Sequence, residues 1–125
     1  MINDETKCLG EIEAKIEYDD GTIETLKFKN RVLNSGLSAI AAGLANSYGG
    51  EYDFFISRMI FGDGGTQSGK PKTVSPSRNG LFGVSRVVKP VIANIDPNNT
   101  SQVVFTSVIA KSDGNGFMLN EMALQ

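Results

Sequence analysis

The clearest hydrophobic pattern lies at the C-terminal end, where a turn separates two apolar runs. Residues 101–110 place apolar side chains on both sides of a period-two repeat, Val103, Phe105 and Ile109 on one and Val104, Val108 and Ala110 on the other. A strand of this kind needs cover on both faces. Residues 112–116 are typical of a turn, and the apolar run resumes at 117–124. We expect residues 101–125 to form one β-hairpin that supplies the central core strand.

A strict alternation of apolar and polar residues begins near Leu9. The apolar positions are Ile12, Ala14, Ile16 and Tyr18, and the charged positions are Glu11, Glu13, Lys15 and Glu17. This pattern predicts a strand with one buried and one solvated face. Residues 19–21 predict a turn and residues 22–29 the return strand, in which Ile23 falls on the opposite side from the other apolar residues. Either this strand has a bulge near Glu24, or Ile23 is a half-exposed edge residue.

One segment, about residues 34–47, predicts an α-helix. Its apolar residues recur at helical spacing, at Leu37, Ile40, Ala41 and Leu44. Asn34 is the preferred N-cap because its side-chain oxygen can accept a hydrogen bond from a free backbone N–H, and Ser35 is the alternative. Residues 46–50, which include two glycines, end the helix.

The middle of the chain predicts two further strands on either side of a long loop. Residues 54–61 are apolar nearly throughout and predict a buried strand, and residues 84–95 predict another. Residues 62–83 are rich in glycine, and loops this long are usually functional or disordered. We expect either a mobile surface loop or one that orders against another subunit. The fold class is therefore mainly β, an antiparallel β-sandwich with one helix in a single domain, residues 1–125.

Composition restricts the possible functions. The 12 basic and 14 acidic residues of the 125-residue chain give a formal charge of -2, which argues against a nucleic-acid partner. No secretion signal begins the chain, and no apolar run approaches the ~18 residues that span a bilayer, so we expect a soluble protein with no membrane partner. Cys8 is the only cysteine. It excludes an intrachain disulfide, and we interpret it as an ordinary thiol rather than one that pairs between copies.

The sequence offers little of the chemistry that catalysis needs. Histidine is absent, which removes Ser-His-Asp and Cys-His arrangements and the usual zinc sites. Aspartates in predicted turns, most of them beside Gly, Pro or Asn, are explained by turn formation, at Asp19, Asp20, Asp63, Asp96 and Asp113. The Asp113 turn also lacks the later ligands of a calcium loop. We therefore expect that the protein is not an enzyme, that it has no catalytic residue, and that it binds neither a metal ion nor a cofactor.

Residues 64–70 match the first seven positions of the phosphate-binding loop pattern and follow an apolar strand. Pro71 stands where a Ser or Thr hydroxyl would hold magnesium. Residues 72–76 do not predict a helix whose N-terminus could meet a phosphate. We therefore reject nucleotide binding.

Charge is distributed unevenly along the chain. Basic residues concentrate in and after the long loop, whereas acidic residues concentrate between Asp4 and Glu24. This polarity suits docking between copies, although a solvated mixed surface would show the same pattern. The candidate partner interface consists of loop residues, namely Asp63, Gly64, Gly65, Thr66, Lys70, Lys72, Arg78 and Phe82.

Four features together resemble small modules of tailed-bacteriophage structural proteins. They are residues 30–37 before an alanine-rich helix, residues 56–66 ending in Phe-Gly-Asp-Gly-Gly-Thr, Arg86 with residues 89–91, and the closing segments 104–107, 113–116 and 119–124. The resemblance covers residues 30–125.

This resemblance implies a β-rich, usually oligomeric virion component near tail-fibre attachment points, baseplates or collars, or on the capsid surface. Family fibres continue past the module, whereas this chain ends at Gln125. We therefore expect a small adaptor in the tail, made in the host cytoplasm, whose partners are its own copies and other virion proteins. The alternatives are a capsid decoration protein and a carbohydrate-binding module that would use Tyr18, Tyr48 and Tyr52.

Overall fold

A computed structural model describes residues 8–44 and 55–125 of the chain. It is mainly β with one described helix and several small antiparallel sheets, which confirms the predicted class at this level. No sandwich or closed sheet is identified among the described residues. The chain divides into two compact units, the first with residues 1–50 and 74–79 and the second with residues 51–73 and 80–125. Each unit is described by itself.

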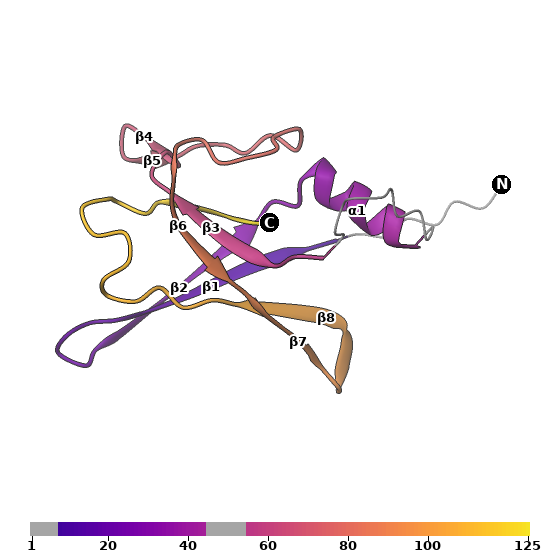
Figure 1. Ribbon diagram of the computed structural model, residues 1–125, viewed down its shortest axis with the longest axis horizontal. Helices are drawn as coiled ribbons and strands as arrows, with labels where there is room; N and C mark the ends of the chain where they lie inside the picture. Colours follow the sequence, from indigo (N-terminus) through magenta and orange to yellow (C-terminus); the bar gives the residue numbers. More distant parts are fainter. Residues whose placement is uncertain (1–7, 45–54) are drawn as a thin grey trace. The chain divides into compact units, whose positions relative to one another are not determined.

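Figure 1 labels the elements of both units other than β9. The described part of the first unit contains β1 (Gly10–Glu17), β2 (Ile23–Asn30) and α1 (Asn34–Leu44). The described part of the second unit contains β3 (Arg58–Gly62), β4 (Thr66–Gln67), β5 (Lys70–Pro71), β6 (Ser85–Pro90), β7 (Ile92–Asp96), β8 (Asn99–Thr106) and β9 (Glu121–Leu124).

Strands β1 and β2 form the predicted hairpin. Their register runs without a shift from the pair Gly10 and Asn30 to the pair Glu17 and Ile23, so there is no bulge near Glu24. One face is mainly apolar, with Ile12, Ala14, Ile16, Leu26 and Phe28 and a single acidic residue, Glu24, and the other is charged. Ile23 lies on the charged face and is 65% exposed. On that face Glu11 and Glu13 lie opposite Lys29 and Lys27, and such cross-strand pairs stabilise a sheet by roughly 0.2–1 kcal/mol each.

The turn between β1 and β2 uses an aspartate as the sequence predicts. The backbone N–H and the hydroxyl of Thr22 both donate to Oδ1 of Asp20, at 2.9 and 2.6 Å. The hydrogen bond from the Thr22 hydroxyl is the main reason why the pKa of Asp20 lies below its ordinary value. Gly21 has a φ of 84°, a conformation that glycine adopts without strain.

The helix α1 begins where the sequence predicts, but its cap differs. The N–H of Leu37 donates to the carbonyl of Leu33 at 3.1 Å, so Leu33 is the N-cap and both Asn34 and Ser35 lie inside the helix. The N–H of Asn34 instead donates to the carbonyl of Pro76 at 2.9 Å. The predicted caps were wrong because the carbonyl of Leu33, one residue before Asn34, accepts the first helical hydrogen bond. The last predicted residues, 45–47, lie outside the described part of the chain.

The helix packs loosely within the described residues. Leu37 and Ile40 are 44% and 47% exposed. With 11 residues, α1 is short, and no described helix is long and apolar enough to cross a lipid bilayer.

The core of the second unit lies on one face of the three-stranded sheet β6-β3-β9. Its apolar residues are Met59, Phe61, Val87, Met122 and Leu124. Met59 and Val87 are the buried hydrophobic residues of the described chain, at 9% and 6% exposure. The turn at Gly114 covers Val87, since a Cβ added there would lie 2.9 Å from Val87 Cγ2.

The predicted C-terminal hairpin is wrong. β8 pairs with β7, and β9 pairs with β3, so the two apolar runs of residues 101–125 belong to different sheets. The turn after β7 is short and is stabilised by the N–H of Asn98, which donates to Oδ1 of Asp96 at 2.8 Å. Closing this short turn costs less chain entropy than closing the longer connection from β8 to β9.

The predicted strand over residues 84–95 is also interrupted. β6 ends at Pro90 and β7 begins at Ile92, and the two strands belong to different sheets. Proline has no N–H to continue a ladder, and the N–H of Val91 donates to the carbonyl of Ser57 at 3.1 Å. The break redirects the chain into a new hairpin.

The cover expected on both faces of residues 101–110 is absent within the described structure. Val103 and Val104 lie on opposite faces of β8 and are 45% and 49% exposed, and Phe105 is half-buried. β8 therefore belongs to a two-stranded hairpin and is not a central core strand.

Val87 and Val88 provide a matched test of this core. They are neighbours on β6, but Val87 is buried and Val88 is 49% exposed. We expect Val87→Ala to reduce the free energy of unfolding by about 2 kcal/mol and Val88→Ala by about 1 kcal/mol or less. Chemical denaturation measures both losses, and equal losses would contradict the placement of the core.

Candidate functional site

The most highly bonded region of the second unit is a glycine-rich loop held by side chains at the start of β9. We call it the polar clasp, and it consists of Asp63, Asn120 and Glu121 with the backbone groups that they bind. Oε1 of Glu121 accepts hydrogen bonds from the N–H groups of Gly64 and Gly83, at 3.3 and 2.8 Å. Oε2 accepts from the N–H of Phe82 at 2.9 Å. One carboxylate therefore joins β9 to both ends of the loop that the sequence places at residues 62–83.

Asn120 binds the same loop from the neighbouring position. Its Oδ1 accepts a hydrogen bond from the N–H of Gly65 at 2.9 Å, and its Nδ2 donates to the hydroxyl of Thr66 at 2.9 Å. Its backbone N–H donates to the carbonyl of Gly62 at 3.0 Å. The amide and the backbone of one residue thus fix the loop against β9.

Asp63 connects the loop to the start of β6. Its Oδ1 accepts a hydrogen bond from the N–H of Val84 at 3.3 Å, and its Oδ2 accepts from Nε of Arg86 at 2.8 Å. The hydrogen bond from Arg86 is the main cause of the lowered pKa of Asp63. The Arg86 guanidinium also lies 4.0 Å from the centroid of the Phe117 ring, a cation–π contact.

Two glycines are required by the close approach of backbone segments in the clasp. A Cβ on Gly64 would collide with the backbone of Gly83, and a Cβ on Gly65 would collide with the carbonyl oxygen of Asn120. These collisions involve backbone atoms, which cannot move aside as a flexible side chain can. The sequence Asp-Gly-Gly-Thr at 63–66 therefore has a structural explanation.

A second ion pair supports the turn that covers the core. Oδ2 of Asp113 accepts a hydrogen bond from the N–H of Ala110 at 2.7 Å and forms an ion pair with Nζ of Lys89. The hydrogen bond from Lys89 is the main reason why the pKa of Asp113 is lowered. Asp113 thus has the turn role that the sequence predicts.

The clasp uses its polar atoms to hold the backbone. Both carboxylate oxygens of Asp63 and of Glu121 accept hydrogen bonds from protein groups. Among the described residues, no group of three or more His, Cys, Asp or Glu side chains could hold a metal ion. The clasp therefore holds three segments of the chain in fixed positions relative to one another, namely the glycine-rich loop, the start of β6 and the start of β9.

The predicted interface residues are distributed over several places. Asp63, Gly64, Gly65 and Thr66 belong to the clasp, and each is buried or half-buried. Lys70, Lys72 and Phe82 line an open depression of the second unit. Arg78 belongs to the first unit, where its N–H donates to the carbonyl of Ser75 at 3.1 Å.

The stretch that resembles a phosphate-binding loop forms a small hairpin. β4 pairs with β5, and the two turn residues Ser68 and Gly69 have φ values of 52° and 75°. Two successive positive φ angles are typical of a type I′ hairpin turn. A strand, not a helix, therefore follows the turn, and residues 62–83 contain regular structure that the sequence analysis did not predict.

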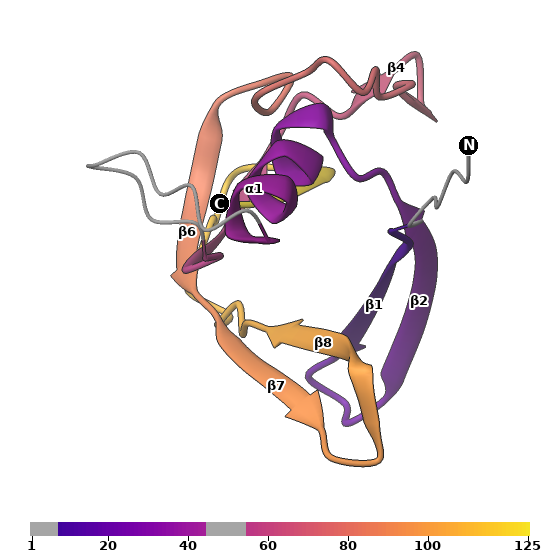
Figure 2. The same cartoon turned by 90° about the vertical axis from the view of Figure 1, so that its right-hand side faces the viewer.

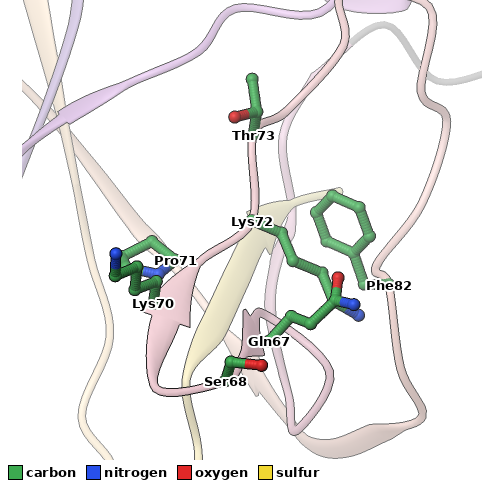
Figure 3. A pocket seen from close by; sticks show the side chains of 7 residues that line it. All are labelled: Gln67, Ser68, Lys70, Pro71, Lys72, Thr73 and Phe82. Carbon is green, nitrogen blue, oxygen red and sulfur yellow. The ribbon is translucent and has the colours of Figure 1, made fainter.

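The depression beside this hairpin is shown in Figure 3. Its volume is about 540 Å³, and it is lined by Gln67, Ser68, Lys70, Pro71, Lys72, Thr73 and Phe82. Nζ of Lys72 lies 5.0 Å from the centroid of the Phe82 ring, which is another cation–π contact. Lys70 points away from this pair (Figure 3). The depression is shallow and open to solvent.

Of the three tyrosines considered for carbohydrate binding, the structure describes only Tyr18. The hydroxyl of Tyr18 donates to Oε2 of Glu24 at 2.5 Å, and this hydrogen bond is the main cause of the raised pKa of Tyr18. Tyr48 and Tyr52 lie outside the described residues.

Sequence reasoning did not identify Asn120 and Glu121 as site residues. Their partners in the loop are 38 to 57 positions away along the chain, and periodicity contains no signal for such contacts. Two features of the sequence could have served as a signal. One is the pair Asn120 and Glu121 at the start of an apolar run, and the other is the consecutive glycines Gly64 and Gly65.

Comparison with protein-family models, curated proteins and solved structures found no match. The resemblance to bacteriophage modules therefore stays a prediction from the segments that suggested it. Two of those segments, residues 61–66 and residues 119–124, contact each other in the clasp.

Replacing Glu121 tests the clasp. We expect Glu121→Ala to reduce the free energy of unfolding by about 2–3 kcal/mol, since three backbone donors lose their acceptor. Glu121→Gln keeps one side-chain oxygen and should cost about half as much. Glu11→Ala, on the exposed face of β1, is the control and should cost about 1 kcal/mol or less, the most that its pair with Lys29 contributes. Equal losses for Glu121→Ala and Glu11→Ala in chemical denaturation would show that the clasp does not stabilise the fold.

The lowered pKa values of Asp63 and Asp113 predict acid sensitivity. A carboxyl group whose pKa is lower in the folded state stabilises the fold above its unfolded pKa, about 3.9, and this contribution disappears as pH falls through the folded value. Thermal unfolding should therefore show Tm falling below about pH 4. Asp63→Asn should make that fall shallower, and Asp63→Asn with Asp113→Asn shallower still. An unchanged pH dependence in the double variant would contradict this assignment.

Proposed function

We propose that the chain is a non-enzymatic structural protein of a tailed-bacteriophage virion. Its place is that of a small adaptor in the tail, collar or baseplate region, where it assembles with copies of itself and with other virion proteins. The observation that carries this proposal is the amount of apolar sheet surface exposed to solvent. The resemblance of residues 30–125 to bacteriophage modules supplies the biological setting.

The exposed surface is most distinct on the hairpin of β7 and β8. In the register of this hairpin, Ala93 lies opposite Phe105 and Ile95 lies opposite Val103, so all four side chains share one face. Ile95 and Val103 are 59% and 45% exposed. Contiguous apolar patches of this kind on a soluble protein mark interaction sites when they are large enough.

The hairpin of β1 and β2 adds a second apolar face. Phe28 and Ile16 on this face are 53% and 39% exposed. Covering a Phe or Ile side chain completely stabilises a protein by about 1.5–3 kcal/mol relative to full exposure, so both hairpins gain from a partner. We propose that each of these faces becomes one layer of an antiparallel β-sandwich when a partner covers it.

The clasp suits a structural role. It uses two carboxylates and an amide to fix a loop and two strands, so the second unit has a rigid centre from which its hairpin extends. A protein that must keep its shape while neighbours bind it benefits from such a centre. The virion is the localisation that follows from this proposal.

Size-exclusion chromatography with light scattering tests the assembly role. We expect a mass above the 13.4 kDa of one chain, rising toward a discrete multiple as the concentration increases, because apolar surface drives association. A single chain at every concentration would contradict self-assembly.

Mass spectrometry of purified phage particles, separated into heads and tails, tests the location. We expect the chain in the tail fraction. Its recovery in the head fraction would replace the tail adaptor by a capsid decoration protein, and its absence from both fractions would overturn the virion role.

A further inference from the structure

The turn that covers Val87 has an asparagine and a glycine at its tip. The connection between β8 and β9 passes beside β6 (Figure 2), and Gly114 lies against Val87 of that strand. The N–H of Phe117 donates to the carbonyl of Gly114 at 3.1 Å, so Asn115 and Gly116 are the two central residues of a tight turn. Both are exposed. Within the described part of the chain, the side chain of Asn115 and the N–H of Gly116 make no hydrogen bond.

An asparagine followed by a glycine carries both groups of an intramolecular reaction. The backbone nitrogen of the glycine attacks Cγ of the asparagine, and the new N–C bond closes a succinimide ring. The side-chain nitrogen leaves as ammonia and takes the proton that the backbone nitrogen loses. Water then opens the ring at either carbonyl group, which yields aspartate or isoaspartate. Glycine favours the attack because it has no Cβ that hinders ring closure.

We infer that Asn115 and Gly116 form a self-modification site at which the folded chain deamidates. Asn115 has a glycine on both sides, Gly114 and Gly116, so little steric hindrance opposes rotation of the backbone into the geometry of attack. Water and the chain itself supply every reactant, so the step requires neither a cofactor nor another protein. The reaction does not depend on the proposed assembly role.

The pair Asn79 and Gly80 provides an internal comparison. It has the same sequence and both of its residues are exposed. Gly80 interacts with another group of the protein, whereas Gly116 has no such interaction among the described residues. A group that must first break a contact spends less time in a reactive conformation. Asn115 should therefore react faster than Asn79 while the protein is folded.

Deamidation at Asn115 alters the turn and the cover of the core. Isoaspartate leads the backbone through the side-chain carbons and lengthens it inside the turn, which opposes the hydrogen bond from Phe117 to Gly114. Because Gly114 lies against Val87, a lengthened turn loosens the cover of that buried residue. Either product also adds one negative charge two residues from Asp113.

Peptide mapping by mass spectrometry, over a time course of the full chain in mildly alkaline buffer, measures the reaction at both pairs. Cleavage after Lys and Arg places them in separate peptides, 79–86 and 112–125. We expect Asn115 to react at least about threefold faster than Asn79 in the folded chain, and the two rates to become similar in denaturant. A rate at Asn115 equal to or below that at Asn79 in the folded chain would overturn the inference, and so would reaction of Asn115 only in denaturant.

Asn115→Ser and Asn79→Ser are matched variants, since serine has no side-chain amide and cannot deamidate. Thermal unfolding before incubation checks that each variant is folded. After the same incubation we expect the Tm of the wild-type chain and of Asn79→Ser to fall by about 3–5 °C, because the turn loses a hydrogen bond, and the Tm of Asn115→Ser to stay constant. An equal fall in Asn115→Ser would overturn the structural effect assigned to this site.

Discussion

The second unit depends on the hydrogen bonds between the start of β9 and the glycine-rich loop. Glu121 alone accepts from three backbone N–H groups on two segments of that loop, Gly64 on one and Phe82 and Gly83 on the other. This contact sets the register in which Gly62 lies opposite Glu121, and it places the chain for the start of β6 at Ser85. The core on the sheet then forms under the turn at Gly114. The clasp thus adds side-chain hydrogen bonds to the backbone ladder that pairs β9 with β3.

The clasp also bears on which surfaces we propose for partner binding. Its polar groups bind the protein's own backbone, and the exposed apolar faces of the hairpins are the surfaces that we propose for partners. The β7–β8 hairpin follows directly from Pro90, where the clasp-supported sheet ends. A rigid centre with an uncovered apolar hairpin is the physical basis for proposing an assembly role.

Local patterns predicted local structure well. The alternation before Glu17 predicted β1 and its charged face, and helical spacing from Leu37 predicted α1, because side chains close in sequence determine such patterns. Pairing was not predictable in the same way. A period-two run such as 101–106 indicates a strand but not its partner, and the short turn at Asp96 favours pairing with β7 because it costs less chain entropy to close than the connection to β9. The contacts of Glu121 were missed because they join distant segments.

Hydrogen exchange measured on the dilute chain and on its assembled form tests the central claim most directly. Exchange protection reports which backbone groups stay bonded and covered. The account predicts that residues 59–66 and 119–124, which form the clasp and its sheet, are protected in both states. Residues 92–106 should gain protection only on assembly. Protection of 92–106 already in the dilute chain, or no gain on assembly, would contradict the view that a fixed clasp presents an apolar hairpin to its partners.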